Sequence, residues 1–307
     1  MLLQPRHKVT GTRSARVRDH PLLTPAMLVY LAFTLLVTIV VAVVASPISL
    51  VNVVLFGAYV ALITFMTRHE QPVMASAVAT TRRRDLALAG AVALVVVIGA
   101  IFFWTAPAMS GYHAIAALFA RSVPSQLAAK AANAALATVL LLLPTAVLLL
   151  IFRPRPTALG LRPRHLGLGL LLAAFGVALA VSAVMAHAPI DIMLWQRFPA
   201  GLLLALIALQ SLVNAIPEEL AFRGVITSRL LPWLGRPGNT LVVSSVVFAL
   251  FHVPANIGSG LPLGYAIFGV FIQPTGLTWA YLWYRTGSIW PGAIWHLSVS
   301  GLGVMYA

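Results

Sequence analysis

Acidic, basic and imidazole side chains that could do chemistry stand at three places in an otherwise apolar sequence. Glu218 and Glu219 are adjacent and precede Arg223 within residues 216–224, and two later apolar runs carry His252 and His296. Ionisable side chains at membrane depth cost roughly 2.5–3.5 kcal/mol each on insertion scales, so they are rarely there without a function. We therefore predict that Glu218, His252 and His296 meet at one buried site.

The spacing of the two glutamates gives them different roles. Adjacent residues on a helix point about 100° apart, and Glu219 stands four residues before Arg223, the favourable order for an ion pair. This pairing leaves Glu218 free. A carboxylate and an imidazole around one water form a general base worth roughly 10²–10⁴-fold in rate. A second histidine with a neighbouring hydroxyl or amide can stabilise an oxyanion, so the set predicts amide hydrolysis without a covalent intermediate.

Each of the three segments also presents a narrow polar face on an apolar helix. Polar side chains recur at a spacing of four residues from the key positions, namely Asn214 from Glu218, Asn256 from His252 and Ser300 from His296. Polar faces of this kind turn toward protein or water and away from lipid. Taken singly, the glutamates could be a solvated helix end and each histidine a helix–helix hydrogen-bond partner. Their joint occurrence in three neighbouring runs favours a common site.

The composition is that of a polytopic membrane protein. Hydrophobic residues make up 61% of the chain and charged residues 8%, and the mean hydropathy of +0.97 lies outside the soluble range. The absence of cysteine excludes disulfides and thiolate chemistry. The net charge of +14 comes from arginines between apolar runs, where they set topology and attract anionic lipid at basic loops, so nucleic-acid binding is not expected.

Apolar runs long enough to cross about 30 Å of hydrocarbon predict an all-α, polytopic integral membrane helix bundle with about eight or nine transmembrane helices. The runs lie near residues 27–45, 50–66, 86–105, 131–152, 166–187, 200–217, 240–257, 264–284 and 288–306. The segment 106–130 is broken by proline and glycine, so we expect an external loop with a short interfacial helix there.

Loop charge predicts the topology and the division of the chain. Arginines follow the second, fourth, sixth and eighth runs, which by the positive-inside rule places the N-terminus in the cytoplasm of a multi-pass protein of the cell (plasma) membrane. Glu218 would then face a cavity open to the cytoplasm. We expect a disordered basic tail at 1–25, a four-helix membrane region at 26–152, a cytoplasmic Pro/Arg linker at 153–165 and a C-terminal helix bundle at 166–307 that carries all the candidate residues.

The order of three motifs resembles one family of intramembrane proteases. Glu-Glu-x-x-x-Arg at 218–223, Phe-x-x-x-His at 248–252 and a histidine at 296 followed by a polar residue at 300 are similar to the CPBP family, the CAAX-processing and bacteriocin-processing (Abi) proteases. The resemblance covers about residues 200–305. It implies that Glu218 and His252 activate the hydrolytic water and that His296 helps to hold the oxyanion. Ser300 stands where the eukaryotic pattern has asparagine, and Asn256 is the alternative donor.

The resemblance implies an intramembrane endopeptidase that cleaves a membrane-associated peptide or protein. It favours a metal-free glutamate mechanism with no cofactor, although Glu218, His252 and His296 could also form the two-histidine, one-carboxylate set of a catalytic Zn²⁺. The arginine-rich and alanine-rich composition indicates a bacterial protein, for which a prenylated substrate is not expected. The alternatives are a non-catalytic bacteriocin-immunity or scaffold protein and a proton-coupled transporter.

Overall fold

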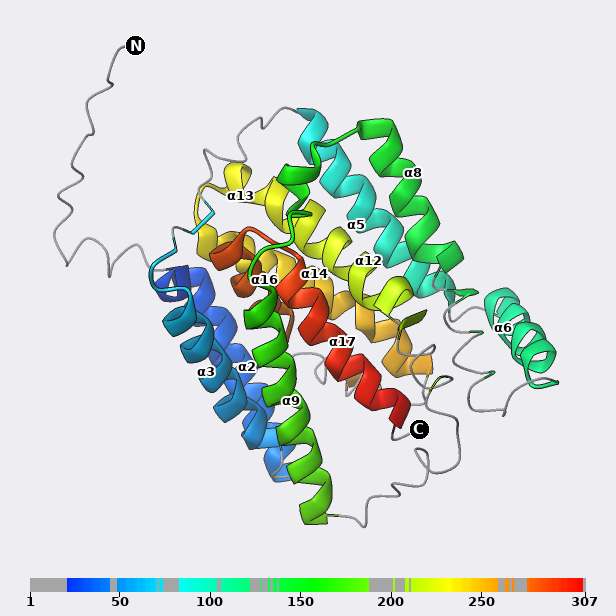
Figure 1. Ribbon diagram of the computed structural model, residues 1–307, viewed down its shortest axis with the longest axis horizontal. Helices are drawn as coiled ribbons and strands as arrows, with labels where there is room; N and C mark the ends of the chain where they lie inside the picture. The colour runs from blue at the N-terminus through cyan, green and yellow to red at the C-terminus, as the bar shows by residue number, and fades with distance from the viewer. Residues whose placement is uncertain are drawn as a thin grey trace, which may run out of the picture.

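The described part of the chain is built of helices only, which confirms the all-α fold class. The computed structural model describes residues 21–44, 49–70, 72–73, 83–103, 106–121, 138–187, 211–258 and 275–305, with a few single residues and pairs between them. The predicted basic tail at 1–25 lies outside these residues apart from its last five positions. Figure 1 shows the helices packed side by side as a bundle, with α6 at its edge.

The helical elements follow the predicted apolar runs closely in the first half of the chain. They are η1 (Pro21–Leu23), α2 (Pro25–Val44), α3 (Ser49–Met66), α5 (Arg83–Phe103), α6 (Ala106–Phe119), η2 (Thr138–Leu142), α8 (Leu143–Phe152), η3 (Pro156–Leu159) and α9 (Leu166–His187). The second half contains η4 (Ser211–Ala215), α12 (Ile216–Glu219), η5 (Leu220–Thr227), α13 (Ser228–Leu234), α14 (Pro237–Gly258), α16 (Thr275–Thr286) and α17 (Trp290–Met305).

The outer faces of the bundle are apolar, as expected of helices in contact with lipid. On α2, for example, the side chains of Val29 and Val43 are 70% and 81% exposed. Among the described residues, Arg83–Phe102 and Pro237–Pro254 are long and apolar enough to cross a bilayer, and four further apolar helices are shorter. The structure thus agrees with a helical membrane protein, while the number of eight or nine spans stays a prediction.

The core lies around α16, a helix of 12 residues that is buried on nearly every side. Its aromatic and aliphatic side chains pack against η5, including Phe222 and Ile226. The helix α14 packs on α16, α17 packs on α9, and α2 and α3 contact α14 and α16 respectively. Because α16 is buried on nearly every side, it is the element against which the site-bearing helices are positioned.

The Pro/Arg linker contacts the turn that leads into α17. Proline at three positions prevents a continuous helix, and the linker instead forms the short 3₁₀ turn η3 with Gly160 at a φ of +70°. The backbone carbonyl of Gly160 accepts a hydrogen bond from the backbone N–H of Ile289 at 3.0 Å, and that of Leu161 accepts one from the indole N–H of Trp290 at 2.9 Å. These bonds fix the start of the helix that carries His296.

We predict that Gly160→Ala destabilises the protein more than Gly235→Ala. Both glycines have positive φ, +70° and +65°, so both substitutions incur the left-handed strain of roughly 1–2 kcal/mol. Only at position 160 would the new Cβ also lie 2.9 Å from the indole nitrogen of Trp283, because the space beside Gly235 is open. The midpoints of thermal unfolding in detergent test this order, and equal shifts would contradict the crowding at Gly160.

Candidate active site

The two glutamates lie in the middle of a helical run that extends beyond the apolar run predicted near residues 200–217. The run continues from Ser211 to Leu234 through η4, α12, η5 and α13, with η4 and η5 in π-helical geometry. Pro217 has no backbone N–H, and in a regular helix its ring would clash with the carbonyl four residues earlier. The wider π turn directly before it accommodates the proline without ending the helix. Glu218 and Glu219 therefore occupy one α-helical turn between two π segments.

Glu219 and Arg223 form the ion pair that their spacing predicted. The distance from Glu219 Oε1 to Arg223 Nη1 is 3.1 Å, and the two side chains are 1% and 0% exposed. Arg223 Nη2 also donates to the backbone carbonyl of Gly276 on α16 at 3.2 Å. The guanidinium carbon lies 4.5 Å from the ring centre of Phe248 and 5.2 Å from that of Trp279. A charged pair enclosed in this way holds η5, α14 and α16 in one arrangement.

The imidazole of His296 lies between the two carboxylates. Its Nε2 is 3.7 Å from Glu218 Oε2, and its Nδ1 is 3.4 Å from Glu219 Oε1. The ring stacks on the indole of Trp279, with centres 4.2 Å apart and planes inclined by 22°. A neutral imidazole has one N–H and can donate to only one of the carboxylates, whereas a protonated ring can donate to both. The imidazole of His296 is therefore placed next to carboxylate oxygens on both of its nitrogen sides.

Glycine at position 292 makes room for this cluster. Gly292 lies on α17 four residues before His296, and a Cβ at this position would be 2.7 Å from Glu219 Oε2. No side chain fits there unless the carboxylate moves. Sequence reasoning missed Gly292 and also Trp279. Gly292 could have been found from its spacing of four residues from His296, which puts the two on the same face of a helix. No motif singled out Trp279.

His252 lies on α14 in a different environment from His296. It is half-buried, its Nδ1 is 2.9 Å from the carbonyl oxygen of Phe248, and its ring packs on Phe248 and Phe251 with centres 4.6 and 5.0 Å apart. Among the described residues it makes no ion pair with either glutamate. The Phe248 ring nevertheless covers Arg223, so one aromatic side chain separates His252 from the ion pair.

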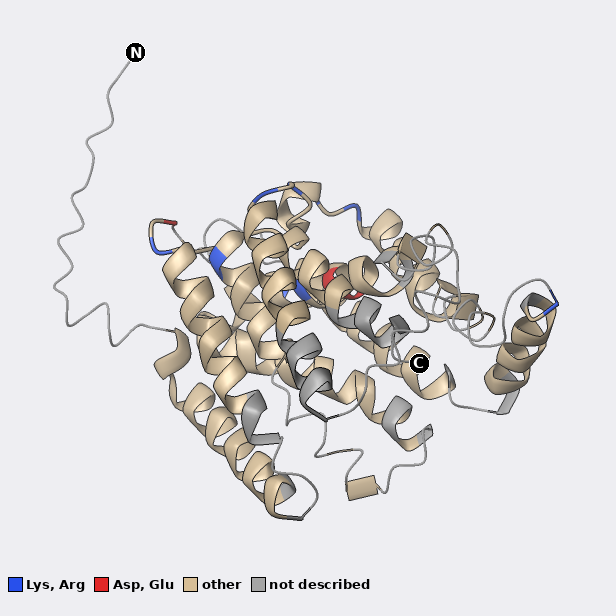
Figure 2. Ribbon diagram, turned by 60° about the horizontal axis from the view of Figure 1, so that its bottom comes forward, with Lys and Arg blue, Asp and Glu red and all other residues tan. Residues whose placement is uncertain are grey.

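The two remaining predicted residues are only partly described. Asn256 lies on α14 and Ser300 on α17, but their side chains are outside the described part of the structure. Figure 2 shows the acidic segment inside the bundle next to a basic one, whereas most other basic segments lie along one end. Two carboxylates, one guanidinium and one imidazole are thus gathered in the protein interior, a combination that indicates function.

A scan against protein families matches this part of the chain. Residues 199–302 match the family described as Type II CAAX prenyl endopeptidase Rce1-like. Residues 199–302 are an Rce1-like domain. The match covers about a third of the chain and includes every residue of the cluster, and it supports a membrane-embedded peptide hydrolase consistent with the predicted CPBP family. Searches of curated proteins and of solved structures gave no match.

The described side chains of the Rce1-like domain do not form a metal site. The alternative Zn²⁺ set needs Glu218, His252 and His296 around one ion. Within the described residues no group of three His, Asp or Glu side chains could hold a metal, and His252 forms no ion pair with Glu218 as His296 does. These residues do not fit the tetrahedral set that zinc requires, so no step below passes through a metal.

We predict that Arg223→Met destabilises the Rce1-like domain strongly and that Glu219→Gln in the same chain restores part of the loss. Removing one partner of a buried pair leaves an uncompensated charge, at a cost of about 3–5 kcal/mol. The double variant has no such charge. Chemical unfolding of the two single variants and the double variant measures the coupling, and additive effects would show that the pair contributes nothing.

Gly292→Ala is expected to displace the Glu219 carboxylate and to destabilise the protein by about 1–3 kcal/mol, the usual cost of overpacking. Gly90→Ala on α5 is the matched control because nothing lies within 4 Å of its added Cβ. Alanine there should be neutral or slightly stabilising, since it is the better helix former. If both variants unfold at the same temperature, the close approach of Glu219 to α17 is wrong.

Proposed function

We propose that this protein is an intramembrane endopeptidase that hydrolyses a peptide bond of a membrane-associated peptide or protein. Two observations support the proposal. The Rce1-like match covers residues 199–302, and the same residues contain the buried cluster of Glu218, Glu219, Arg223 and His296. Neither a lipid-facing surface nor a simple structural core needs two carboxylates around one imidazole.

Glu218 is the base in this proposal, and the single observation that carries it is the contrast between the two glutamates. Glu219 is 1% exposed and bound to Arg223, whereas Glu218 is 8% exposed and has no Arg partner. Its Oε2 is buried and makes no hydrogen bond with any described residue. Buried polar atoms are normally hydrogen-bonded, so an oxygen without such a partner suits the binding of a reacting water.

The proposed reaction needs only water as co-reactant. Glu218 takes a proton from the water, whose oxygen attacks the carbonyl carbon of the peptide bond and forms a tetrahedral oxyanion. The C–N bond then breaks, and the proton passes to the amine nitrogen, so that a carboxylate and an amine leave. Glu219 and Arg223 are positioning residues here: their pair directs Glu219 away from the water and supports His296 from its Nδ1 side.

The two histidines have different assignments. His252 orients the water together with Glu218, and His296 donates to the oxyanion with Ser300 or Asn256 as a further donor, as the motif order implies. The structure has His296 within 4 Å of Glu218 Oε2, which supports a second assignment in which His296 orients the water. If His252 orients the water, substitution of His252 should lower the rate as much as loss of Glu218. If His296 orients the water, substitution of His296 should do so.

We also retain the finer expectations as parts of the proposal. The protein lies in the plasma membrane with its N-terminus in the cytoplasm, the linker at 153–165 separates the N-terminal helices from the protease bundle, and the site opens toward the cytoplasm. The mechanism is metal-free. A prenylated C-terminal peptide, named by the family description, is one substrate to be tested beside membrane-protein segments.

The test is cleavage of a membrane-proteome-derived peptide library and of a prenylated CAAX peptide by the purified protein. Glu218→Gln should lower the rate by about 10²–10⁴-fold because the general base is lost. His252→Ala should match it if His252 orients the water, and His296→Ala should lower the rate by roughly 10²–10³-fold as an oxyanion donor. Glu70→Gln and His69→Ala remove exposed groups of the same types and should leave the rate unchanged.

Further outcomes decide between this function and its alternatives. Cleavage rates that do not respond to a chelator support metal-free chemistry. Loss of cleavage on chelation would indicate a Zn²⁺-dependent mechanism. The immunity or scaffold function would be favoured if the folded wild-type protein cleaves nothing and its cellular phenotype survives Glu218→Gln. Proton flux in liposomes that depends on Glu218 would indicate a transporter.

A further inference from the structure

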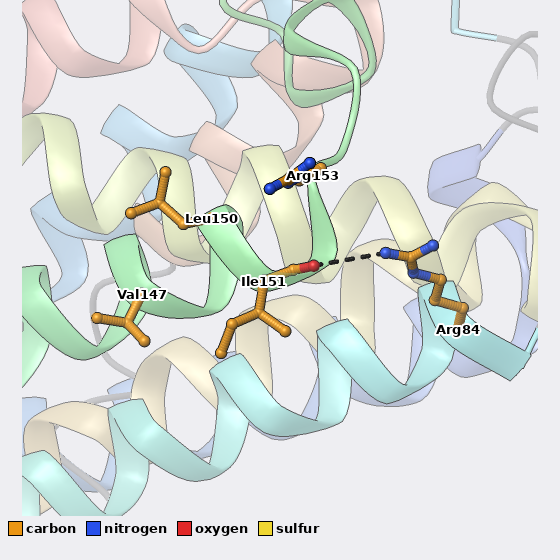
Figure 3. Close-up of a pocket in the computed structure, with 5 residues that line it drawn as sticks. All are labelled: Arg84, Val147, Leu150, Ile151 and Arg153. Carbon is orange, nitrogen blue, oxygen red and sulfur yellow. Dashed lines mark hydrogen bonds between the residues drawn. The ribbon is translucent and has the colours of Figure 1, made fainter.

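A concave site lies away from the carboxylate cluster, between α5 and α8. The cavity is open to the outside, has a volume of about 520 Å³ and is lined by Arg84, Val147, Leu150, Ile151 and Arg153. Figure 3 shows two arginines at one end of the site and aliphatic side chains of α8 along the other. None of these residues takes part in the proposed hydrolysis, so the site needs an explanation of its own.

Arg84 is held in place and still has donors to spare. Its Nη2 donates to the backbone carbonyls of Ile151 and Phe152 at 3.4 and 3.1 Å, which are terminal carbonyls of α8 without partners in the helix. Its guanidinium also lies 5.9 Å from the ring centre of Phe152. A guanidinium has five N–H donors, and Nε and Nη1 make no hydrogen bond with the described residues. A fixed guanidinium with free donors is suited to bind phosphate.

Arg153 lies directly after α8 and ends it in the left-handed conformation, with a φ of +47°. Its side chain is exposed, and within the described part of the chain it has no hydrogen-bond or ion-pair partner. Asp85, next to Arg84 in sequence, forms an ion pair with Arg229 on α13 at 3.7 Å. The carboxylate next to Arg84 in sequence is thus paired with another arginine, and the lining of the cavity carries the two positive charges of Arg84 and Arg153.

The remaining walls of the cavity are apolar and exposed. Val147, Leu150 and Ile151 are 51%, 72% and 62% exposed. They lie on the last turns of α8 next to the two arginines, in a helix whose composition is almost entirely aliphatic. A soluble anion has no use for this apolar wall, whereas a molecule with a phosphate at one end and a hydrocarbon chain at the other matches both parts.

We propose that this groove binds one anionic phospholipid, whose phosphate lies between Arg84 and Arg153 and whose acyl chain runs along Val147 and Leu150. Its position at the ends of α5 and α8 is where a lipid headgroup meets the hydrocarbon in the predicted topology. This is one specific site, distinct from the diffuse attraction of basic loops to an anionic surface. The proposal does not depend on the proposed peptidase activity.

Native mass spectrometry of the full chain in detergent, titrated with phosphatidylglycerol or phosphatidylcholine, tests the site. The first phosphatidylglycerol should bind more tightly than phosphatidylcholine. Arg153→Asn should weaken this binding by about fivefold, the effect of one arginine at a lipid phosphate. Asparagine is chosen because it tolerates positive φ, and Arg84 remains to hold α5 to α8.

Arg155→Asn is the matched control, since Arg155 is an exposed arginine two residues away that does not line the groove. It should leave the binding of the first lipid unchanged. Equal weakening by both variants, or no preference over phosphatidylcholine, would overturn the proposal in favour of diffuse attraction. Thermal unfolding of both variants without added lipid ensures that weakened binding is not a loss of fold.

A further variant distinguishes a lipid from a soluble phosphate compound. Leu150→Ser removes part of the apolar wall and keeps both arginines, so it should weaken phosphatidylglycerol binding and leave the binding of glycerophosphoglycerol, the same headgroup without acyl chains, unchanged. If the variant binds phosphatidylglycerol as the wild type does and glycerophosphoglycerol competes fully, the site binds a soluble anion and the lipid assignment is wrong.

Discussion

The arrangement of the protein interior depends on the buried ion pair between Glu219 and Arg223. Its two members are 1% and 0% exposed, and a charge of either sign left alone at such a place would cost several kcal/mol. The pair is supported from three helices. Gly276 of α16 supplies a carbonyl, Phe248 of α14 supplies an aromatic face, and Gly292 of α17 supplies the space for the carboxylate. Each of these helices is thereby restrained relative to η5.

The restraint explains how a cluster of charges can persist in so apolar a protein. His296 contacts both carboxylates because α17 approaches Glu219 closely at Gly292, and α17 itself begins at a turn that is hydrogen-bonded to the 153–165 linker. Residues 153–165 therefore do more than connect α8 to α9. Backbone carbonyls of this segment fix the position of α17 along its own axis. That position decides which groups the His296 imidazole contacts.

The sequence predicted well where one local rule was sufficient. The spacing of Glu219 and Arg223 led to the ion pair, and the apolar runs led to α2, α3, α5 and α9 within a few residues. The π segments on either side of Glu218 and Glu219 were not predicted, because a π turn cannot be recognised from hydrophobic periodicity. The position of His296 between two glutamates depends on tertiary contacts with Trp279 and Gly292, and no spacing rule reports these.

The π segment η5 affects the directions of side chains on the helical run from Ser211 to Leu234. In a regular helix the angle between Glu219 and Arg229 is set by residue count alone, at 100° per residue. The wide turns of η5 between them change that angle, and in the structure Glu219 contacts His296 on α17 while Arg229 pairs with Asp85 on α5. One continuous helical run thereby contacts His296 on one neighbouring helix and Asp85 on another. The angle between the side chains at positions 219 and 229 is set by the backbone. It therefore persists when other residues are substituted at these two positions.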